Sequence, residues 1–137
     1  MMDDVILNKK ESIERCIQQI RTFYARESDS SFEEDWIKQD AIALNLQRGI
    51  QQCIDLANHV VRIKKLGIPK TSKDGFVLLA ENGIIPRALL SPLAKMVGFR
   101  NILVHQYQKI EPAVLRSIIE QNLDDILALS DNVLKNG

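Results

Sequence analysis

Apolar side chains recur at helical spacing through most of the chain, and this pattern predicts a protein built from helices. The first predicted helix begins at Asp3 or Asp4, because either carboxylate can accept hydrogen bonds from the free N–H groups of a first turn. It ends near Arg26, before a stretch rich in Ser and Asp that has the composition of a loop. Its apolar stripe consists of Ile6, Ile13, Ile17, Ile20 and Tyr24.

The second predicted helix is the longest and runs from Phe32 or Asp35 to Leu66. Gly67 is expected to end it, because glycine is favoured just past a helix, and Pro69 cannot continue it. A helix of about thirty residues spans roughly 45 Å and can form the spine of a bundle. Its expected inward stripe consists of Ile37, Ala41, Leu44, Ile50, Cys53, Ala57, Val60 and Val61.

Shorter helices are predicted in the second half of the chain. Residues 72–81 form one, a Ser-Pro pair at 91–92 opens the next, and a Glu-Pro pair at 111–112 opens the last. No stretch alternates cleanly between apolar and polar residues, as a half-buried strand would. We therefore expect an all-α fold, an up-and-down bundle of four to five helices, in a single domain that spans residues 1–137.

Composition narrows the classes of function. The formal net charge is +0, from 18 basic and 18 acidic side chains, so contacts with RNA would need a local patch. Cys16 and Cys53 lie in helical patterns and are expected to be buried and reduced. Cysteine and histidine show no metal-ligand spacing, so we expect neither a metal nor a cofactor. The acidic start of the chain and the lack of a long apolar run predict a cytoplasmic protein without a membrane segment.

One stretch, residues 99–107 with the sequence FRNILVHQY, gathers most of the groups that could do chemistry. On a helical wheel advanced by about 100° per residue, Arg100 and Tyr107 are nearly eclipsed, and Asn101 and His105 form the adjoining edge. A guanidinium in an apolar stripe is costly to bury without a partner, so Arg100 should face a pocket, a subunit interface or a carboxylate. The apolar face is expected to comprise Leu93, Met96, Val97, Phe99, Leu103 and Val104.

Two interpretations of this stretch are open from the residues alone. In the structural interpretation, Arg100 pairs with an acid of another helix, such as Asp40 or Asp55, and His105 is a hydrogen-bonded core histidine. In the functional interpretation, the four polar side chains converge on a phosphate.

The functional interpretation has a defined chemistry. Histidine exchanges a proton near neutral pH, and arginine can stabilise developing negative charge with two parallel hydrogen bonds. Together they suit cleavage of RNA by the neighbouring 2′-hydroxyl, which needs no metal. This reaction needs a base and usually an acid, so a symmetric dimer could supply a second histidine.

The motif Arg100-x-x-x-x-His105-x-Tyr107, with Asn101 directly after the arginine, resembles the signature of the HEPN superfamily and, within it, of the HepT toxin family. Residues 39–48 and 54–59 are also similar to the long second helix of that family. The likeness covers nearly the whole chain.

The resemblance implies a helical-bundle homodimer in which two motifs meet in a composite cleft. It implies a metal-independent endoribonuclease, the toxin of a type VII toxin–antitoxin system, with Arg100 and His105 as catalytic residues and Asn101 in support. It also implies an MntA-type nucleotidyltransferase antitoxin as partner, which transfers AMP from ATP to Tyr107, and an RNA substrate such as tRNA or mRNA. Added AMP would bring bulk and negative charge to the cleft and compete with RNA phosphate.

A local basic run comprises Arg62, Lys64, Lys65, Lys70 and Lys73. It can be a solvated helix end, where cations suit the helix dipole, or a phosphate track that leads RNA to the cleft.

Two further hypotheses compete with an active ribonuclease. A non-catalytic HEPN module would bind nucleotide or RNA, or would serve only as the regulatory partner of a nucleotidyltransferase. In a purely structural role, Arg100 would form a salt bridge at a dimer interface. Histidine at position 59 is expected to be a core or interface residue.

Overall fold

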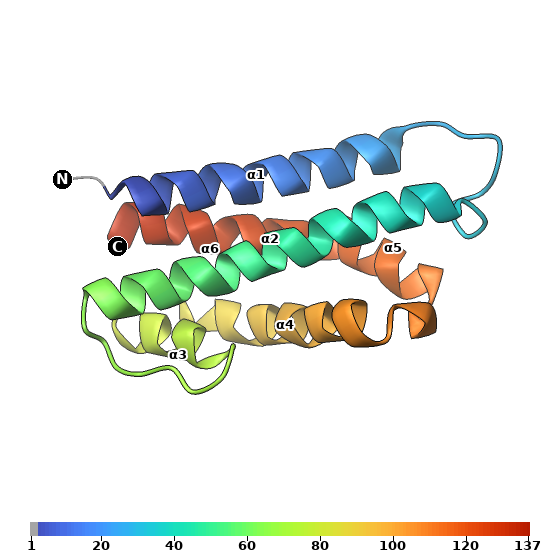
Figure 1. Cartoon of the computed structure of the whole chain (residues 1–137). Helices are drawn as coiled ribbons and strands as arrows, with labels where there is room; N and C mark the ends of the chain where they lie inside the picture. The colour runs from blue at the N-terminus through green and yellow to red at the C-terminus, as the bar shows by residue number, and fades with distance from the viewer. Residues whose placement is uncertain (1–2) are drawn as a thin grey trace.

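The computed structural model describes residues 3–137 and contains six α-helices and two short 3₁₀ turns within that range (Figure 1). The start of the chain, whose acidic residues Asp3 and Asp4 argued against a signal peptide, also includes Met1 and Met2, and these two lie outside the described residues. The expected all-α class is confirmed. The helices are α1 (Asp4–Ala25), α2 (Trp36–Ile63), α3 (Asp74–Glu81), α4 (Leu90–His105), α5 (Pro112–Gln121) and α6 (Leu123–Asn136), with 3₁₀ turns η1 (Arg87–Leu89) and η2 (Tyr107–Lys109).

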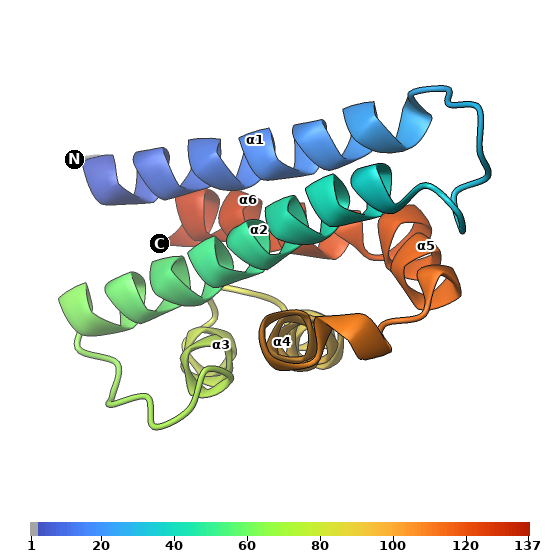
Figure 2. The same cartoon turned by 45° about the vertical axis from the view of Figure 1, so that its right-hand side comes forward.

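The long helices run up and down in one bundle. Helix α2 returns antiparallel to α1, α4 runs beneath α2 in the opposite direction, and α6 returns beside α1, so that both ends of the chain lie at the same end of the bundle (Figure 1). Viewed after a turn of 45°, α3 and α4 lie side by side beneath α2 (Figure 2). The C-terminal end of α4 is thereby placed next to the N-terminal part of α2.

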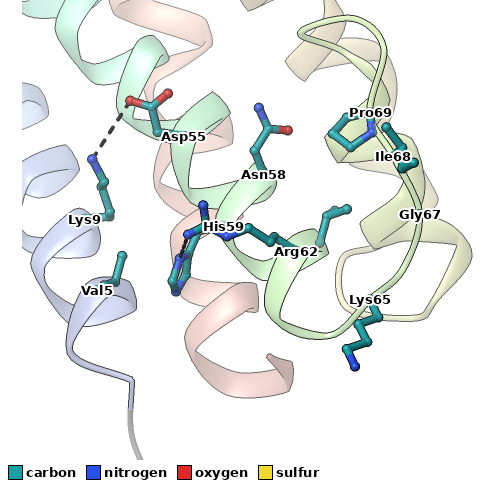
Figure 3. A pocket seen from close by; sticks show the side chains of 11 residues that line it. Val5, Lys9, Asp55, Asn58, His59, Arg62, Lys65, Gly67, Ile68 and Pro69 are labelled. Atoms are coloured by element: carbon teal, nitrogen blue, oxygen red, sulfur yellow. Dashed lines mark hydrogen bonds and ion pairs between the residues drawn. The ribbon is translucent and has the colours of Figure 1, made fainter.

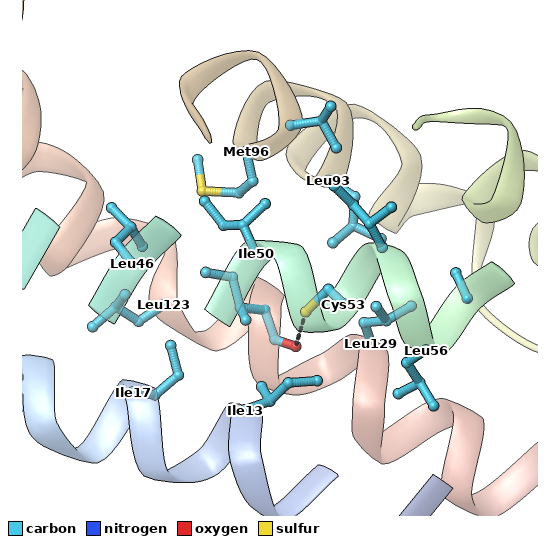
Figure 4. Packing of buried hydrophobic residues seen from close by; sticks show 14 of the residues in the cluster. Ile13, Ile17, Leu46, Ile50, Cys53, Leu56, Leu93, Met96, Leu123 and Leu129 are labelled. Carbon is cyan, nitrogen blue, oxygen red and sulfur yellow. Dashed lines mark hydrogen bonds between the residues drawn. The ribbon is translucent and has the colours of Figure 1, made fainter. Parts of the chain in front are cut away.

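The core forms where α1, α2, α4 and α6 meet (Figure 4). Ile13 of α1, Ile50 of α2 and Met96 of α4 are each 0–1% exposed, and burial of such side chains stabilises a fold by about 1.5–3 kcal/mol each. Both cysteines are buried and free, as expected. The Cys53 thiol contacts the Ile126 carbonyl oxygen at 3.9 Å, and burial raises its pKa far above the usual value for a thiol.

Part of the predicted stripe of α2 is wrong. Ile37 is 84% exposed and Leu44 is 46% exposed, although both lie seven residues apart on one helical face. The N-terminal half of α2 carries apolar residues around most of its circumference, so periodicity alone allows more than one inward face. The core uses Ile42, Ala43 and Leu46 instead, each 0–4% exposed.

Helix ends follow local backbone chemistry. The Asp3 carboxylate accepts a hydrogen bond from the Val5 N–H at 2.8 Å, which confirms that a carboxylate caps α1. The end predicted for α2 at Gly67 is late: Lys65 takes φ 55°, and the Leu66 N–H donates to the Val61 carbonyl at 2.9 Å. A lysine therefore occupies the left-handed position expected for glycine.

The last predicted helix is two helices, so α-helices outnumber the four to five expected. The chain leaves α5 at Asn122, whose φ of −119° and ψ of −6° depart from those of a regular α-helix, and α6 begins at the next residue. The Asn122 side chain donates to the Asp125 carboxylate at 3.2 Å across the break. The start of α5 is as predicted, with Glu111 as the cap and Pro112 in the first turn.

Candidate active site

Helix α4 presents its apolar side to the bundle and brings the motif to its C-terminal end. Leu93, Met96, Val97, Phe99 and Leu103 are buried as predicted, at 1–6% exposure. Val104 is 40% exposed, so its assignment to the same face is wrong. On the wheel Val104 falls between Leu93 and Val97, which are buried, but it lies in the last turn of α4, one residue before the helix ends.

Arg100 lies half-buried on α4 without a carboxylate partner in the described residues. Its Nη1 donates to the Oδ1 of Asn101 at 3.0 Å, and its Nε is buried with no hydrogen-bond partner in that part of the chain. None of the ion pairs within residues 3–137 includes it. The proposed pairing with Asp40 or Asp55 is therefore wrong for this chain by itself, and the guanidinium keeps its charge unneutralised.

His105 is the last residue of α4 and is exposed. The alternative of a hydrogen-bonded core histidine is therefore wrong. Asn101, one turn before it, is also exposed. The structure places a cation, an amide and an imidazole within the last two turns of one helix, where solvent or a ligand can reach them.

Tyr107 does not continue the helix, so the prediction that Arg100 and Tyr107 are nearly eclipsed on one helix is wrong. The helix ends because Gln106 adopts φ −142° and ψ 40°, after its N–H has donated to the Ile102 carbonyl at 2.8 Å. Tyr107 then opens η2, which the Ile110 N–H closes by donating to the Tyr107 carbonyl at 3.1 Å. A wheel cannot be extended past the residue at which the backbone leaves helical geometry.

The Tyr107 hydroxyl instead donates a hydrogen bond to the Asp40 carboxylate of α2. Partial burial, together with this carboxylate, raises the pKa of Tyr107 to about 12. Tyr107 remains 39% exposed beside a hollow of about 460 Å³, whose lining includes Leu103 and Leu115. Asp40 was missed as a site residue, because no sequence signal joins two residues 67 positions apart.

The basic run lies at the opposite end of the bundle. Arg62 and Lys65 line a groove of about 780 Å³ at the C-terminal end of α2 (Figure 3). Lys64 lies beside them, and Lys70 and Lys73 follow in the connection to α3. Between Asp40 and Arg62, α2 covers roughly 30 Å, so the structure does not bring this run to the motif of the same chain.

Histidine 59 belongs to this second region (Figure 3). Its Nε2 lies 2.7 Å from the Asp3 carboxylate and its Nδ1 lies 3.3 Å from Arg62. The hydrogen bond from His59 lowers the pKa of Asp3. The His59 side chain is 12% exposed at this end of the bundle, and its expected role as a core or interface residue stays a prediction.

Two further findings apply to the part of the chain that is described. No group of three or more histidine, cysteine, aspartate or glutamate side chains in residues 3–137 could hold a metal ion. Over the same range, each helix is too short or too polar to cross a membrane.

Comparisons with known proteins agree on one group. The model of a family described as HepT-like ribonucleases matches residues 13–133. The chain is 44% identical over 124 residues to the mRNA nuclease HepT of Shewanella oneidensis, covering 90% of this chain and 92% of that protein. It is 31% identical over 111 residues to the tRNA nuclease HepT of Aphanizomenon flos-aquae, covering 79% and 73% respectively.

A solved structure has the same architecture. It is the tri-AMPylated HEPN toxin of Shewanella oneidensis in complex with its MNT antitoxin. The TM-score is 0.88 at 42% sequence identity, over 96% of this chain and 98% of that one.

Proposed function

We propose that this chain, which belongs to the HepT-like ribonuclease family, is the RNA-cleaving toxin of a toxin–antitoxin pair. The activity is endoribonucleolytic. The relatives named above act on mRNA in one case and on tRNA in the other, and these two classes are the candidate substrates. The proposed site of action is the cytoplasm, where the RNA substrates and ATP of such a pair are found.

The observation that carries the site assignment is the state of Arg100. A half-buried guanidinium with an unpartnered Nε and no carboxylate within the described chain is a preformed anion site. In the proposed reaction, the 2′-hydroxyl attacks the adjacent phosphorus, and the bond to the 5′-oxygen breaks. Arg100 stabilises the negative charge that develops, His105 transfers a proton, and Asn101 holds the guanidinium in place.

The reaction calls for a second proton-transfer group, and a second copy of the chain is the proposed source. The sequence contains two histidines, and His59 is bonded to Asp3 at the far end of α2. Two exposed apolar side chains of α2 also lie beside the motif, as expected of a surface that a partner covers. Trp36 is 75% exposed and Leu44 is 46% exposed, and each lines a hollow together with Tyr107.

The partner is an MntA-type nucleotidyltransferase antitoxin, and its target on this chain is Tyr107, in a system of type VII. The related toxin of Shewanella oneidensis is tri-AMPylated in its complex with the MNT antitoxin. Tyr107 is partly exposed and lies two residues beyond His105. A phosphodiester there would bring a negative charge close to Arg100 and His105 and compete with RNA phosphate for the same cations.

The basic run provides a second contact for RNA. Arg62, Lys64, Lys65, Lys70 and Lys73 lie roughly 30 Å from the motif end of α2, a span that a folded or extended RNA can bridge. Their role is affinity, since contacts to phosphate do not select a base.

The decisive experiment compares Arg100→Ala and His105→Ala with the unmodified chain. Loss of proton transfer should lower the rate of RNA cleavage by about 10²–10⁴-fold for His105→Ala. Loss of the anion site should lower it by about 10²–10³-fold for Arg100→Ala. The measurements are cleavage of a labelled RNA in the presence of a chelator and growth after induction.

Arg87→Ala is the matched control, because Arg87 is exposed in η1 at the other end of α4. It should cleave RNA at the unmodified rate. Circular dichroism and solution mass should be the same for all three variants. Full toxicity of both motif variants would refute the proposal, and RNA binding without cleavage by the unmodified chain would favour a non-catalytic module.

A further inference from the structure

The Tyr107 hydroxyl is held by a group outside its own segment. It donates to the Oδ1 of Asp40, which lies in the second turn of α2. The 3₁₀ turn around Tyr107 is closed by backbone hydrogen bonds, with the Lys109 N–H on the Gln106 carbonyl at 2.8 Å. The phenol oxygen is therefore aimed at a carboxylate by two separate elements of the fold.

Within the described chain, Asp40 is the one group placed to take a proton from this hydroxyl. Two hollows, of about 460 and 310 Å³, adjoin Tyr107, and Asp40 lines both. Their other walls are apolar or amide side chains such as Leu103 and Gln47, without a further carboxylate, histidine, lysine or arginine. Both Asp40 and Tyr107 are exposed, so an enzyme bringing a nucleotide can reach the pair.

We propose that Asp40 is the general base for the transfer of AMP to Tyr107, so that the toxin itself supplies a catalytic group for its own inactivation. The proposal rests on the assignment of Tyr107 as the acceptor. In the step, Tyr107 Oη attacks the α-phosphorus of ATP and forms the Oη–P bond. The bond from that phosphorus to the oxygen bridging to the β-phosphate breaks, pyrophosphate leaves, and the hydroxyl proton passes to Asp40 Oδ1.

The chemistry of the phenol explains why a base is needed. Burial and the neighbouring carboxylate raise the pKa of Tyr107 to about 12, so the free phenolate is scarce at neutral pH. A hydrogen-bonded carboxylate overcomes this scarcity, because the phenol becomes acidic as its oxygen bonds to phosphorus and the proton then moves without prior ionisation. The contact that disfavours the phenolate in the resting protein thus assists proton removal in the transition state.

The test uses Asp40→Asn, which keeps the size of the side chain and an oxygen that can accept the hydrogen bond but cannot take up the proton. The full-length chain is mixed with its nucleotidyltransferase antitoxin and magnesium ATP, and AMP incorporation is followed by intact mass over a series of pH values. Asp40→Asn should lower kcat for incorporation by about 10²–10⁴-fold with little change in the KM for the toxin. Its rate should also rise about tenfold per pH unit below the phenol pKa, while the unmodified rate stays flatter.

Two variants serve as controls. Asp55→Asn makes the same change on the same helix, fifteen residues away, where Asp55 accepts from Gln51 at 2.9 Å, and it should react at the unmodified rate. Asp40→Glu keeps a carboxylate and should restore the flatter pH profile. Rates of Asp40→Asn within twofold of Asp55→Asn at every pH would overturn the proposal. A lower rate with an unchanged pH profile would do the same, because it would leave Asp40 only a positioning role.

Tyr107→Phe separates this inference from the proposed acceptor. If Tyr107→Phe still takes up AMP, the assignment of Tyr107 fails, and the role of Asp40 fails with it. If Tyr107→Phe takes up none while Asp40→Asn reacts normally, the acceptor stands and only the general base is refuted. The expected result is that Tyr107→Phe takes up no AMP and that Asp40→Asn shows the altered pH profile.

Discussion

Arg100 and Tyr107 are held in opposite ways at one end of the bundle. Arg100 keeps a buried Nε without a partner in the described chain, which costs about 1–3 kcal/mol by the desolvation of an unsatisfied donor. Tyr107 has its hydroxyl engaged by Asp40. The unpartnered guanidinium of Arg100 can bind an anion, whereas the hydroxyl of Tyr107 can pass its proton to the carboxylate that it contacts. Arg100 is therefore the proposed catalytic residue, and Tyr107 is the proposed site of inactivation.

At the residue scale, the Tyr107–Asp40 contact predicts the behaviour of the protein in alkali. The pKa of Tyr107 is raised from 10.0 to about 12 in the folded chain. A pKa that is higher in the folded than in the unfolded protein contributes stability. This contribution is fully present below the pKa of the unfolded state and is lost as the pH rises through the pKa of the folded state. The free energy of unfolding of the unmodified chain, relative to Tyr107→Phe, should therefore fall between about pH 10 and pH 12.

The measurement is the difference in phenolate absorbance between the unmodified chain and Tyr107→Phe, which cancels the contribution of Tyr24, the other tyrosine. The midpoint should lie near 12, and Asp40→Asn should shift it toward lower pH, because one of the causes of the raised pKa is removed. A midpoint near 10 in the unmodified chain would show that the hydroxyl is not bonded to the carboxylate.

At the element scale, α4 carries a glycine two residues before Arg100. Gly98 lies in the helix interior, and a Cβ placed on it would meet, within 4 Å, no described atom beyond its chain neighbours and the adjacent backbone of its own helix. A Cβ on Gly83 would likewise have open space around it, but the φ of Gly83 is 73°. The two positions therefore differ in backbone conformation and not in packing.

Gly98→Ala should raise the free energy of unfolding by about 0.5–1 kcal/mol, because alanine loses less conformational freedom in a helix. Gly83→Ala should lower it by about 1–2 kcal/mol, because a residue with a Cβ is strained at positive φ. Urea denaturation at fixed protein concentration measures both. A loss of stability for Gly98→Ala would indicate that its Cβ meets a second copy of the chain.

At the scale of the whole molecule, the bundle separates two regions along α2. The motif and Asp40 lie at one end, with the exposed Trp36 and Leu44, and the basic run with His59 lies at the other. Within the described chain, the two ends share the same long helix and the same core, but no ion pair joins their charged groups. A partner that covers the motif end therefore leaves the basic end free.

Leu44→Glu tests the proposed homodimer, because Leu44 is 46% exposed and lines a hollow with Tyr107. A charge there should convert a species of twice the chain mass to a monomer and should lower RNA cleavage with it, since the proposed site needs two copies. Light scattering after size-exclusion chromatography measures the mass.

Ile68→Glu is the control, because Ile68 is 85% exposed at the far end of the bundle and its substitution should leave the mass unchanged. A Leu44→Glu variant that keeps the doubled mass would contradict the use of this face. An unmodified chain that stays monomeric at micromolar concentration would contradict the dimer itself.

The all-α class, the main helices and the motif residues could all be predicted from the order of amino acids. Helical spacing was enough in α1, which has one dominant apolar stripe, and Ile13 and Ile17 are buried as predicted. In α4 it predicted the burial of Met96 and Leu103 but not the exposure of Val104, because apolar residues lie on more than one side of that helix. The Arg-x-x-x-x-His spacing was visible because both residues lie on one helix. Local chemistry also placed the start of α5 at Pro112, where the proline ring suits the first turn.

Features that depend on how the helices pack against one another could be determined only from the tertiary structure. Ile37 and Leu44 fit the helical period as well as Ile42 does, and only packing against α1 and α4 chose between the faces. Tyr107 and Asp40 are brought together by the return of α4 beneath α2, over a separation that no local pattern reports. The separation between the motif and the basic run likewise depends on how α4 packs against α2. Periodicity describes one helix at a time, whereas a site between helices depends on how they pack.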